Sequence, residues 1–383
     1  MGSIDSLWIP TIAVSHIVGV LMWLYAVTRL AGPKSKRKAQ QQSQGGPDEQ
    51  PAAKHPSPYQ NGHGDRAVEL SQAIHEELDF DPETAVPVVG GTSPLPVELS
   101  WTLISYKVLQ GKPGKGKKSK VKQILHPCTG RFRAGEAAAL MGPSGAGKST
   151  MMDILTGRKP SEGTGGTVRV NGHVLTPVIA GKYLSYVGQE DVFLPNLTAW
   201  ESLNFYSWLS VPAALNRADR QAGMHKTLET MGLQEVKHSM VGGSMPGGVL
   251  VRGLSGGEKR RLSVACGLIG NPSLVFLDEP TTGLDSHAAL SMVRHIVSLT
   301  RLGHTIACSI HQPRQEIFNA FDKVVILSEG HQVYIDPPGG CCQWFNGGLG
   351  YAYRPEEDGT VADWVITLVS IRFRDEDTAH NSR

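Results

Sequence analysis

The residues from Gly142 to Thr150 read Gly-Pro-Ser-Gly-Ala-Gly-Lys-Ser-Thr and directly follow the apolar run at 137–141. A glycine-rich turn between a buried strand and a helix points successive backbone N–H groups inward, which is how proteins cradle phosphate groups. Glycine is needed at Gly145 and Gly147 because the turn is tight. The segment therefore predicts a site for a nucleoside triphosphate, against the alternative of a glycine-rich turn that binds nothing.

Three side chains of this loop have separate expected roles. Lys148 should reach the β- and γ-phosphates, Ser149 should present its hydroxyl to Mg²⁺, and Thr150 should lie near the α-phosphate. A nucleoside triphosphate with Mg²⁺ is thus the expected ligand. The predicted phosphate-binding loop comprises Gly142, Pro143, Ser144, Gly145, Ala146, Gly147, Lys148, Ser149 and Thr150.

A second chemical element is the apolar run at 274–277, which ends in the carboxylates Asp278 and Glu279. An uninterrupted apolar run indicates a buried parallel strand, and such strands deliver ligand-binding residues at their carboxyl ends. We expect Asp278 to hold Mg²⁺ through water and Glu279 to polarise the water that attacks the γ-phosphate. A solvated acidic turn is the weaker alternative, because the preceding residues would bury the strand.

Between these two elements stands Leu-Ser-Gly-Gly-Glu at 254–258, followed by a basic run and an apolar helical stretch. This segment resembles the signature motif of ATP-binding cassette (ABC) ATPases. Ser255, Gly256 and Gly257 should open a second helix N-terminus, and hence a second site for an anion. In that family, the signature of one subunit closes over the ATP held by the other. The resemblance therefore implies a head-to-tail dimer with a second cassette, identical or different.

Three further residues match the family in their order along the chain. Gln189 resembles the glutamine that binds Mg²⁺ and whose loop touches the membrane domain. His311 resembles the histidine that contacts the γ-phosphate, and Asp285 resembles the aspartate of the loop that crosses the dimer interface. Taken singly, these residues could be a loop amide, a strand-terminal histidine and a helix cap. Tyr106 could stack on adenine or simply pack in a first strand.

The segment at 191–208 and the Ser-Ile-His-Gln-Pro at 309–313 resemble the G subfamily of ABC transporters, the White-Brown-Complex half-transporters. The similarity covers roughly residues 97 to 369. It weakens near the end, where Gly359 and Thr360 replace the expected Asn-Pro. The subfamily implies export of a lipid-like substrate, driven by ATP hydrolysis.

The implied fold is an α/β P-loop NTPase of the ABC type, with an antiparallel β-subdomain at its start and a helical subdomain at about 196–245. Composition divides the rest of the chain. The predicted segments are a transmembrane or anchor segment at 1–32, a disordered linker at 33–96, the cassette at 97–345, and a post-cassette segment with a polar tail at 346–383.

Residues 7–28 contain no charged side chain, and a basic cluster follows at 34–38. This pattern predicts a membrane span with the cassette facing the cytosol, although an amphipathic or buried helix is the alternative. The basic run at 112–120 could contact anionic lipid headgroups or form a solvated loop. The formal net charge of +2 favours no nucleic acid partner.

No series of about six apolar helices follows the cassette in this sequence, although the G subfamily has one there. The membrane domain is therefore expected in a separate chain or in a continuation of this one. Two other functions stay open: a truncated cassette that regulates a full half-transporter, and a non-transport ABC ATPase. Among non-transport ABC ATPases, those that act in translation carry two cassettes in one chain, whereas this chain has one. Those that act in DNA repair have a long coiled coil between the phosphate loop and the signature, whereas here the two motifs are close in sequence.

Overall fold

The computed structural model describes residues 93–110, 120–211, 215–244, 248 and 250–371. Several expectations lie outside the described residues. These are the predicted span at 7–28, most of the linker, nearly all of the basic run and the C-terminal tail.

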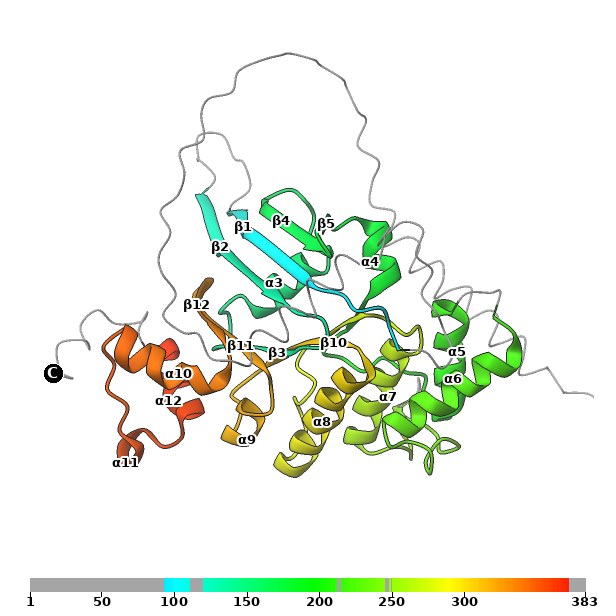
Figure 1. Ribbon diagram of the computed structural model, residues 1–383. Helices are drawn as coiled ribbons and strands as arrows, with labels where there is room; N and C mark the ends of the chain where they lie inside the picture. The colour runs from blue at the N-terminus through cyan, green and yellow to red at the C-terminus, as the bar shows by residue number, and fades with distance from the viewer. Residues whose placement is uncertain (1–92, 111–119, 212–214, 245–247, 249, 372–383) are drawn as a thin grey trace, which may run out of the picture. The chain divides into compact units, whose positions relative to one another are not determined.

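A six-stranded sheet forms the centre of the described fold (Figure 1). Its five neighbouring strands from β11 to β6 are parallel, and only β12 pairs antiparallel, with β11. In sheet order the strands are β12 (His331–Asp336), β11 (Lys323–Ser328), β3 (Ala137–Met141), β10 (Thr305–Ile310), β9 (Leu274–Leu277) and β6 (Leu184–Val187).

Both faces of the sheet are buried at β11, β3, β10 and β9, and successive residues of these strands contribute to different cores. Ala137, Ala139 and Met141 belong to one hydrophobic cluster, whereas Ala138 and Leu140 belong to the other. Successive side chains of a strand point to opposite faces, so a strand covered on both sides must be apolar throughout. This requirement explains the uninterrupted apolar runs in the sequence.

An antiparallel sheet and two helices contribute to one of these cores. The sheet order is β2-β1-β4-β5, and α3 contacts β1, β2 and β4. Trp101 and Phe132 pack edge to face in this core, with ring centroids 4.8 Å apart. The elements are β1 (Leu99–Gln110), β2 (Lys120–Phe132), α3 (Lys148–Leu155), β4 (Thr164–Val170), β5 (His173–Val174) and α4 (Pro177–Tyr183).

Helices cover the other face of the central sheet (Figure 1). Helix α7 contacts α5, α6 and α8, and α5 begins with a capping box between Thr198 and Glu201. These findings confirm the predicted α/β class with its antiparallel and helical subdomains. The elements are α5 (Ala199–Ser210), α6 (Arg217–Thr230), β7 (Gly243–Ser244), β8 (Leu250–Val251), α7 (Gly256–Leu268), α8 (Ser286–Ser298) and η1 (Leu299–Leu302).

The segment after residue 345 packs onto the same core as the helices. Trp364 is 4% exposed. The centroid of its ring lies 5.0 Å from the ring centroid of Tyr353 and 6.1 Å from that of Phe345. The Ser328 hydroxyl donates to the Val369 carbonyl at 2.6 Å. The last elements are α9 (Gln315–Phe318), η2 (Pro338–Gly340), α10 (Cys341–Gln343), η3 (Trp344–Gly348), α11 (Pro355–Asp358) and α12 (Val361–Ile371).

Within the described ranges, every helix is too short or too polar to cross a membrane.

Replacing Trp364 by Ala tests whether α12 is part of the core. We expect Trp364→Ala to lower the free energy of unfolding by about 3–5 kcal/mol, because the variant loses a buried indole and leaves a cavity. Trp344→Ala is the matched control and should cost less, since that side chain is already 46% exposed. Urea unfolding measures both values. Equal losses in the two variants would contradict the packing described for α12.

Candidate nucleotide-binding site

The predicted chemical residues gather where the parallel strands end. Gly142 follows β3, Asp278 follows β9, His311 follows β10, and Gln189 lies two residues beyond β6. Because these strands are parallel neighbours, their carboxyl ends lie along one edge of the sheet. Ligands of open α/β sheets bind at that edge.

The glycines of the phosphate loop adopt backbone conformations that other residues avoid. Gly142, Gly145 and Gly147 have φ values of 141°, 80° and 102°. At Gly142 a Cβ atom would also collide with the carbonyl oxygen of Leu327. Gly147 precedes α3, and no side chain caps that helix. The first N–H groups of α3 therefore have no side-chain cap, and the binding of phosphates there stays a prediction.

The side chain of Lys148 is folded back over this loop. Its Nζ donates to the carbonyl oxygens of Gly142 at 2.8 Å and Pro143 at 2.9 Å, and the residue is 6% exposed. Burial lowers the pKa of the ammonium group, while the charges of Glu279 and Asp278 act in the opposite direction. Phosphate oxygens would replace these carbonyls with stronger, charge-assisted acceptors.

Two hydroxyl groups hold the carboxylate of Asp278. Tyr186 donates to Oδ2 at 2.8 Å, and Ser309 donates to Oδ1 at 2.6 Å. Burial, followed by the hydrogen bond to Asp278, raises the pKa of the Tyr186 phenol, so it remains a donor at neutral pH. Each carboxylate oxygen has a second lone pair, which leaves Asp278 able to accept a hydrogen bond from water.

Glu279 lies beside Asp278 in a left-handed backbone conformation, with φ at 47°. Its N–H donates to the Ser309 hydroxyl at 2.8 Å. Its Oε2 accepts from the Gln189 amide and the Thr282 hydroxyl, both at 2.9 Å. Such a conformation is uncommon for a non-glycine residue and persists where its surroundings hold it in place. The structure thus brings the predicted base and the predicted glutamine into direct contact.

His311 is exposed at the end of β10. The register pairs Ile310 with Met141, so His311 and Gly142 each follow a member of this pair. The predicted histidine therefore lies beside the start of the phosphate loop.

Ser255 and Asp285 are exposed helix caps. The Ser255 hydroxyl accepts from the N–H of Glu258, whose carboxylate accepts in return from the Ser255 N–H at 2.8 Å. Hydrogen bonds from Ser255 lower the pKa of Glu258. Asp285 accepts from the N–H groups of His287 and Ala288, both at 3.0 Å. Their roles toward a partner's nucleotide, and those of Gly256 and Gly257, stay predictions.

Sequence reasoning missed the side chains that support the two carboxylates. Ser309 begins the segment that resembles the G subfamily, and Tyr186 and Thr282 lie three residues before Gln189 and Asp285, respectively. None of these three side chains is singled out by the motifs. The pairing of β9 with β10 and β6 is what places Ser309 and Tyr186 next to Asp278. Tyr106 is half-buried, with the Lys159 ammonium 5.2 Å from its ring centroid, and its contact with adenine stays a prediction.

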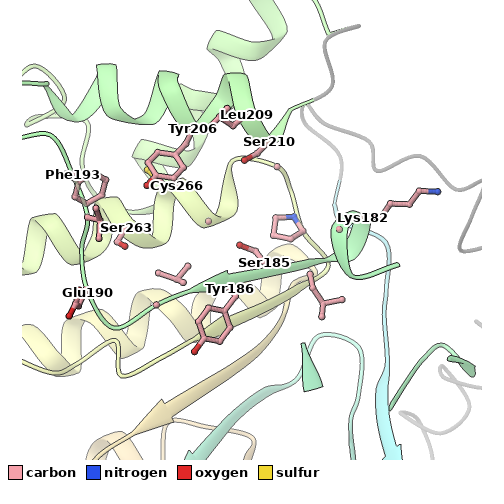
Figure 2. A pocket seen from close by; sticks show the side chains of 18 residues that line it. Lys182, Ser185, Tyr186, Glu190, Phe193, Tyr206, Leu209, Ser210, Ser263 and Cys266 are labelled. Atoms are coloured by element: carbon pink, nitrogen blue, oxygen red, sulfur yellow. The ribbon is translucent and has the colours of Figure 1, made fainter. Parts of the chain in front are cut away.

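A cleft of about 740 Å³ adjoins the loop that carries Gln189 (Figure 2). Its walls come from β6, from the residues that follow this strand, from α5 and from α7. Both aromatic and polar side chains line it, including those of Tyr186, Glu190, Phe193, Tyr206 and Ser263.

Comparisons with known proteins agree with this geometry. Residues 125–282 match the family described as ABC transporter. ABC transporter G family member 12 of Dictyostelium discoideum is 48% identical over 211 residues, which are 55% of this chain and 33% of that protein. ABC transporter G family member 7 of Arabidopsis thaliana is 36% identical over 298 residues, covering 77% of this chain and 39% of that protein.

Among solved structures, the post-hydrolysis dimer of the ATP-binding cassette MJ0796, bound to ADP and Pi, matches with a TM-score of 0.51 at 21% identity. The match covers 63% of this chain and 98% of that chain. The present chain spans about a third of the length of its Dictyostelium relatives. The fold, the strand-end site and the sequence matches agree with one another, and they show that this chain carries an ATP-binding cassette of the ABC transporter family, related to those of the G family.

Proposed function

We propose that the cassette binds ATP with Mg²⁺ and hydrolyses it, and that paired cassettes use this reaction to drive export across a membrane. The observation that carries the proposal is the hydrogen bond between the Gln189 amide and the Glu279 carboxylate, beside the carboxylate of Asp278. This arrangement puts a general base next to residues that could hold a metal ion, at the end of the sheet where the phosphates would lie.

The oxygen atoms at the site suit Mg²⁺, which prefers hard oxygen ligands and usually keeps phosphate oxygens and waters among them. The side chains that would hold it are the Ser149 hydroxyl, the Gln189 amide oxygen and, through water, Asp278. Because the Gln189 nitrogen donates to Glu279, its oxygen faces elsewhere and can bind a cation. Phosphate oxygens and waters would supply the remaining ligands.

The steps of hydrolysis can be assigned to residues of this chain. The phosphate loop and Lys148 bind the phosphates, and Mg²⁺ would neutralise charge that develops on them. Glu279 accepts a proton from the attacking water, while His311 orients that water against the γ-phosphate. As the water oxygen bonds to the γ-phosphorus, the bond from that phosphorus to the β-phosphate oxygen breaks, and ADP and phosphate are the products. Product release then reopens the paired cassettes.

Closure requires a second cassette, whose signature would cover the phosphates held here. The signature residues Ser255 and Gly256 are exposed, and among the described residues no atom outside the adjoining backbone lies within 4 Å of a Cβ placed at Gly256. This exposed helix start, although its own side chains form a capping box, can therefore approach the nucleotide of a partner. The match to a cassette described as a dimer supports this arrangement.

Transport also requires a membrane domain, which we place in a separate chain or in a continuation of this one. The cleft beside the Gln189 loop is the surface through which such a domain would act, since Gly188 and Glu190 on either side of Gln189 line it. The relatives named as G family transporters support a membrane location. The basic cluster at 34–38 favours a cytosolic side for the cassette. By analogy with that family, the substrate would be lipid-like.

Lys148→Ala tests nucleotide binding. We expect ATP affinity to fall about 10- to 100-fold, because the variant loses charge-assisted hydrogen bonds to the phosphates. Lys226→Ala, an exposed lysine on α6, is the control and should bind ATP like the parent protein. Titration with a fluorescent ATP analogue measures both affinities. Unchanged affinity in Lys148→Ala would contradict the phosphate-loop assignment.

Glu279→Gln tests hydrolysis. The amide has nearly the same shape but cannot accept the proton, so turnover should fall by about 100-fold or more while ATP still binds. Phosphate release gives the rate, and size-exclusion chromatography with ATP should show accumulation of a closed dimer. Glu235→Gln, at an exposed position, should retain the parent rate. Hydrolysis by Glu279→Gln at the parent rate would show that another group is the base.

A further inference from the structure

The buried guanidinium of Arg260 joins three separate segments of the site. Arg260 lies in α7, near its start, and is 3% exposed. Its Nη1 donates to the carbonyl oxygens of Gly188 at 2.7 Å and Gln189 at 3.2 Å, and to Oδ1 of Asp191 at 2.9 Å. Its Nη2 donates to the carbonyl oxygen of Asp278 at 2.6 Å. One side chain thus connects the signature helix, the Gln189 loop and the end of β9.

A charge at this depth is costly unless it is fully paired. Asp191, whose side chain is 22% exposed, is the one carboxylate within ion-pair distance of Arg260 among the described residues. The remaining partners of its two terminal nitrogens are backbone carbonyls, whereas the buried Nε has no hydrogen-bond partner among the described residues. A shift of the Gln189 loop away from β9 would stretch the hydrogen bonds that Nη1 and Nη2 make to these two segments, and the network therefore resists that shift.

The two ends of the guanidinium serve different segments. Nη1 holds the loop, whereas Nη2 holds the strand end through Asp278. A planar fork can bridge both because its nitrogen atoms point in fixed, different directions. A lysine has a single nitrogen atom and cannot reproduce this bridge, although it would keep the charge and the ion pair with Asp191.

The loop held by Arg260 determines where Gln189 meets Glu279. The backbone carbonyl of Gln189 accepts from Arg260, and the side chain of the same residue donates to Glu279. We propose that Arg260 is a positioning residue for the hydrolysis described above: it ties α7 to the Gln189 loop and to the end of β9, and so sets Gln189 against Glu279. This inference rests on the proposed function. In the proposed hydrolysis, Arg260 itself touches no reacting atom.

Arg260→Lys in the full chain gives the first measurement. We expect ATP turnover to fall about tenfold or more, because a small misplacement of Gln189 is costly. The dissociation constant and stoichiometry of ATP binding should stay within about twofold of the parent values, since the phosphate loop is untouched. The Mg²⁺ concentration that gives half-maximal turnover should rise. Arg294→Lys, at an exposed position of α8, is the matched control and should change none of these values.

A double-mutant cycle with Gln189→Ala separates positioning from a purely structural role. If Arg260 acts through Gln189, then adding Arg260→Lys to Gln189→Ala should lower turnover by less than about twofold. An equal fall in both backgrounds would overturn the inference. So would a loss of ATP-binding stoichiometry in parallel with turnover, because that result would mean that Arg260 serves only to maintain the fold.

The parent protein distinguishes failure of the inference from failure of the proposed function. If the parent protein hydrolyses ATP and Arg260→Lys hydrolyses it at the same rate, the role of Arg260 is overturned and the proposed function stands. A parent protein that binds ATP without any turnover would count against the proposed hydrolysis, and the inference about Arg260 would fall with it.

Discussion

Parallel pairing of β3, β10 and β9 is the constraint on which the site depends. The pairing brings Gly142, Asp278 and His311 to one edge of the sheet, although they lie far apart along the chain. Both faces of these strands are buried, so a shift of register would expose apolar residues or move the chemical residues out of line. The burial of apolar side chains thus fixes the register of the strands and, with it, the positions of these polar groups.

Polar contacts then refine what the sheet brings together. The buried hydroxyl of Ser309 accepts from the Glu279 N–H and donates to Asp278, so it relates the two acids to each other. Arg260 likewise links two segments, because its guanidinium donates to the carbonyl oxygen of Gln189 and to that of Asp278, which follows β9. In surroundings of low dielectric, such networks are strong when complete and costly when broken. The carboxylates can therefore have separate roles although they are adjacent in sequence.

The fold beyond residue 345 shows how packing extends the domain. Helix α12 contributes Trp364, Val365 and Val369 to the core that lies under the helices. The sequence departs from the G-subfamily pattern at Gly359 and Thr360, just before this helix. The apolar residues of α12 are nevertheless spaced so that they lie on one face. Burial of a helix face requires apolar side chains at suitable intervals and tolerates changes in the preceding turn.

The sequence alone determined the class of the fold, its phosphate loop, the acidic strand and the family to which the cassette is related. Those features are local: a glycine turn, an apolar strand and a helix cap each need only neighbouring residues. Tertiary structure decided which side chains support the acids and how Gln189 meets Glu279. Tyr186, Ser309 and Arg260 act across pairs of elements distant in sequence, and their contacts exist only once the strands have paired and α7 has packed beside them.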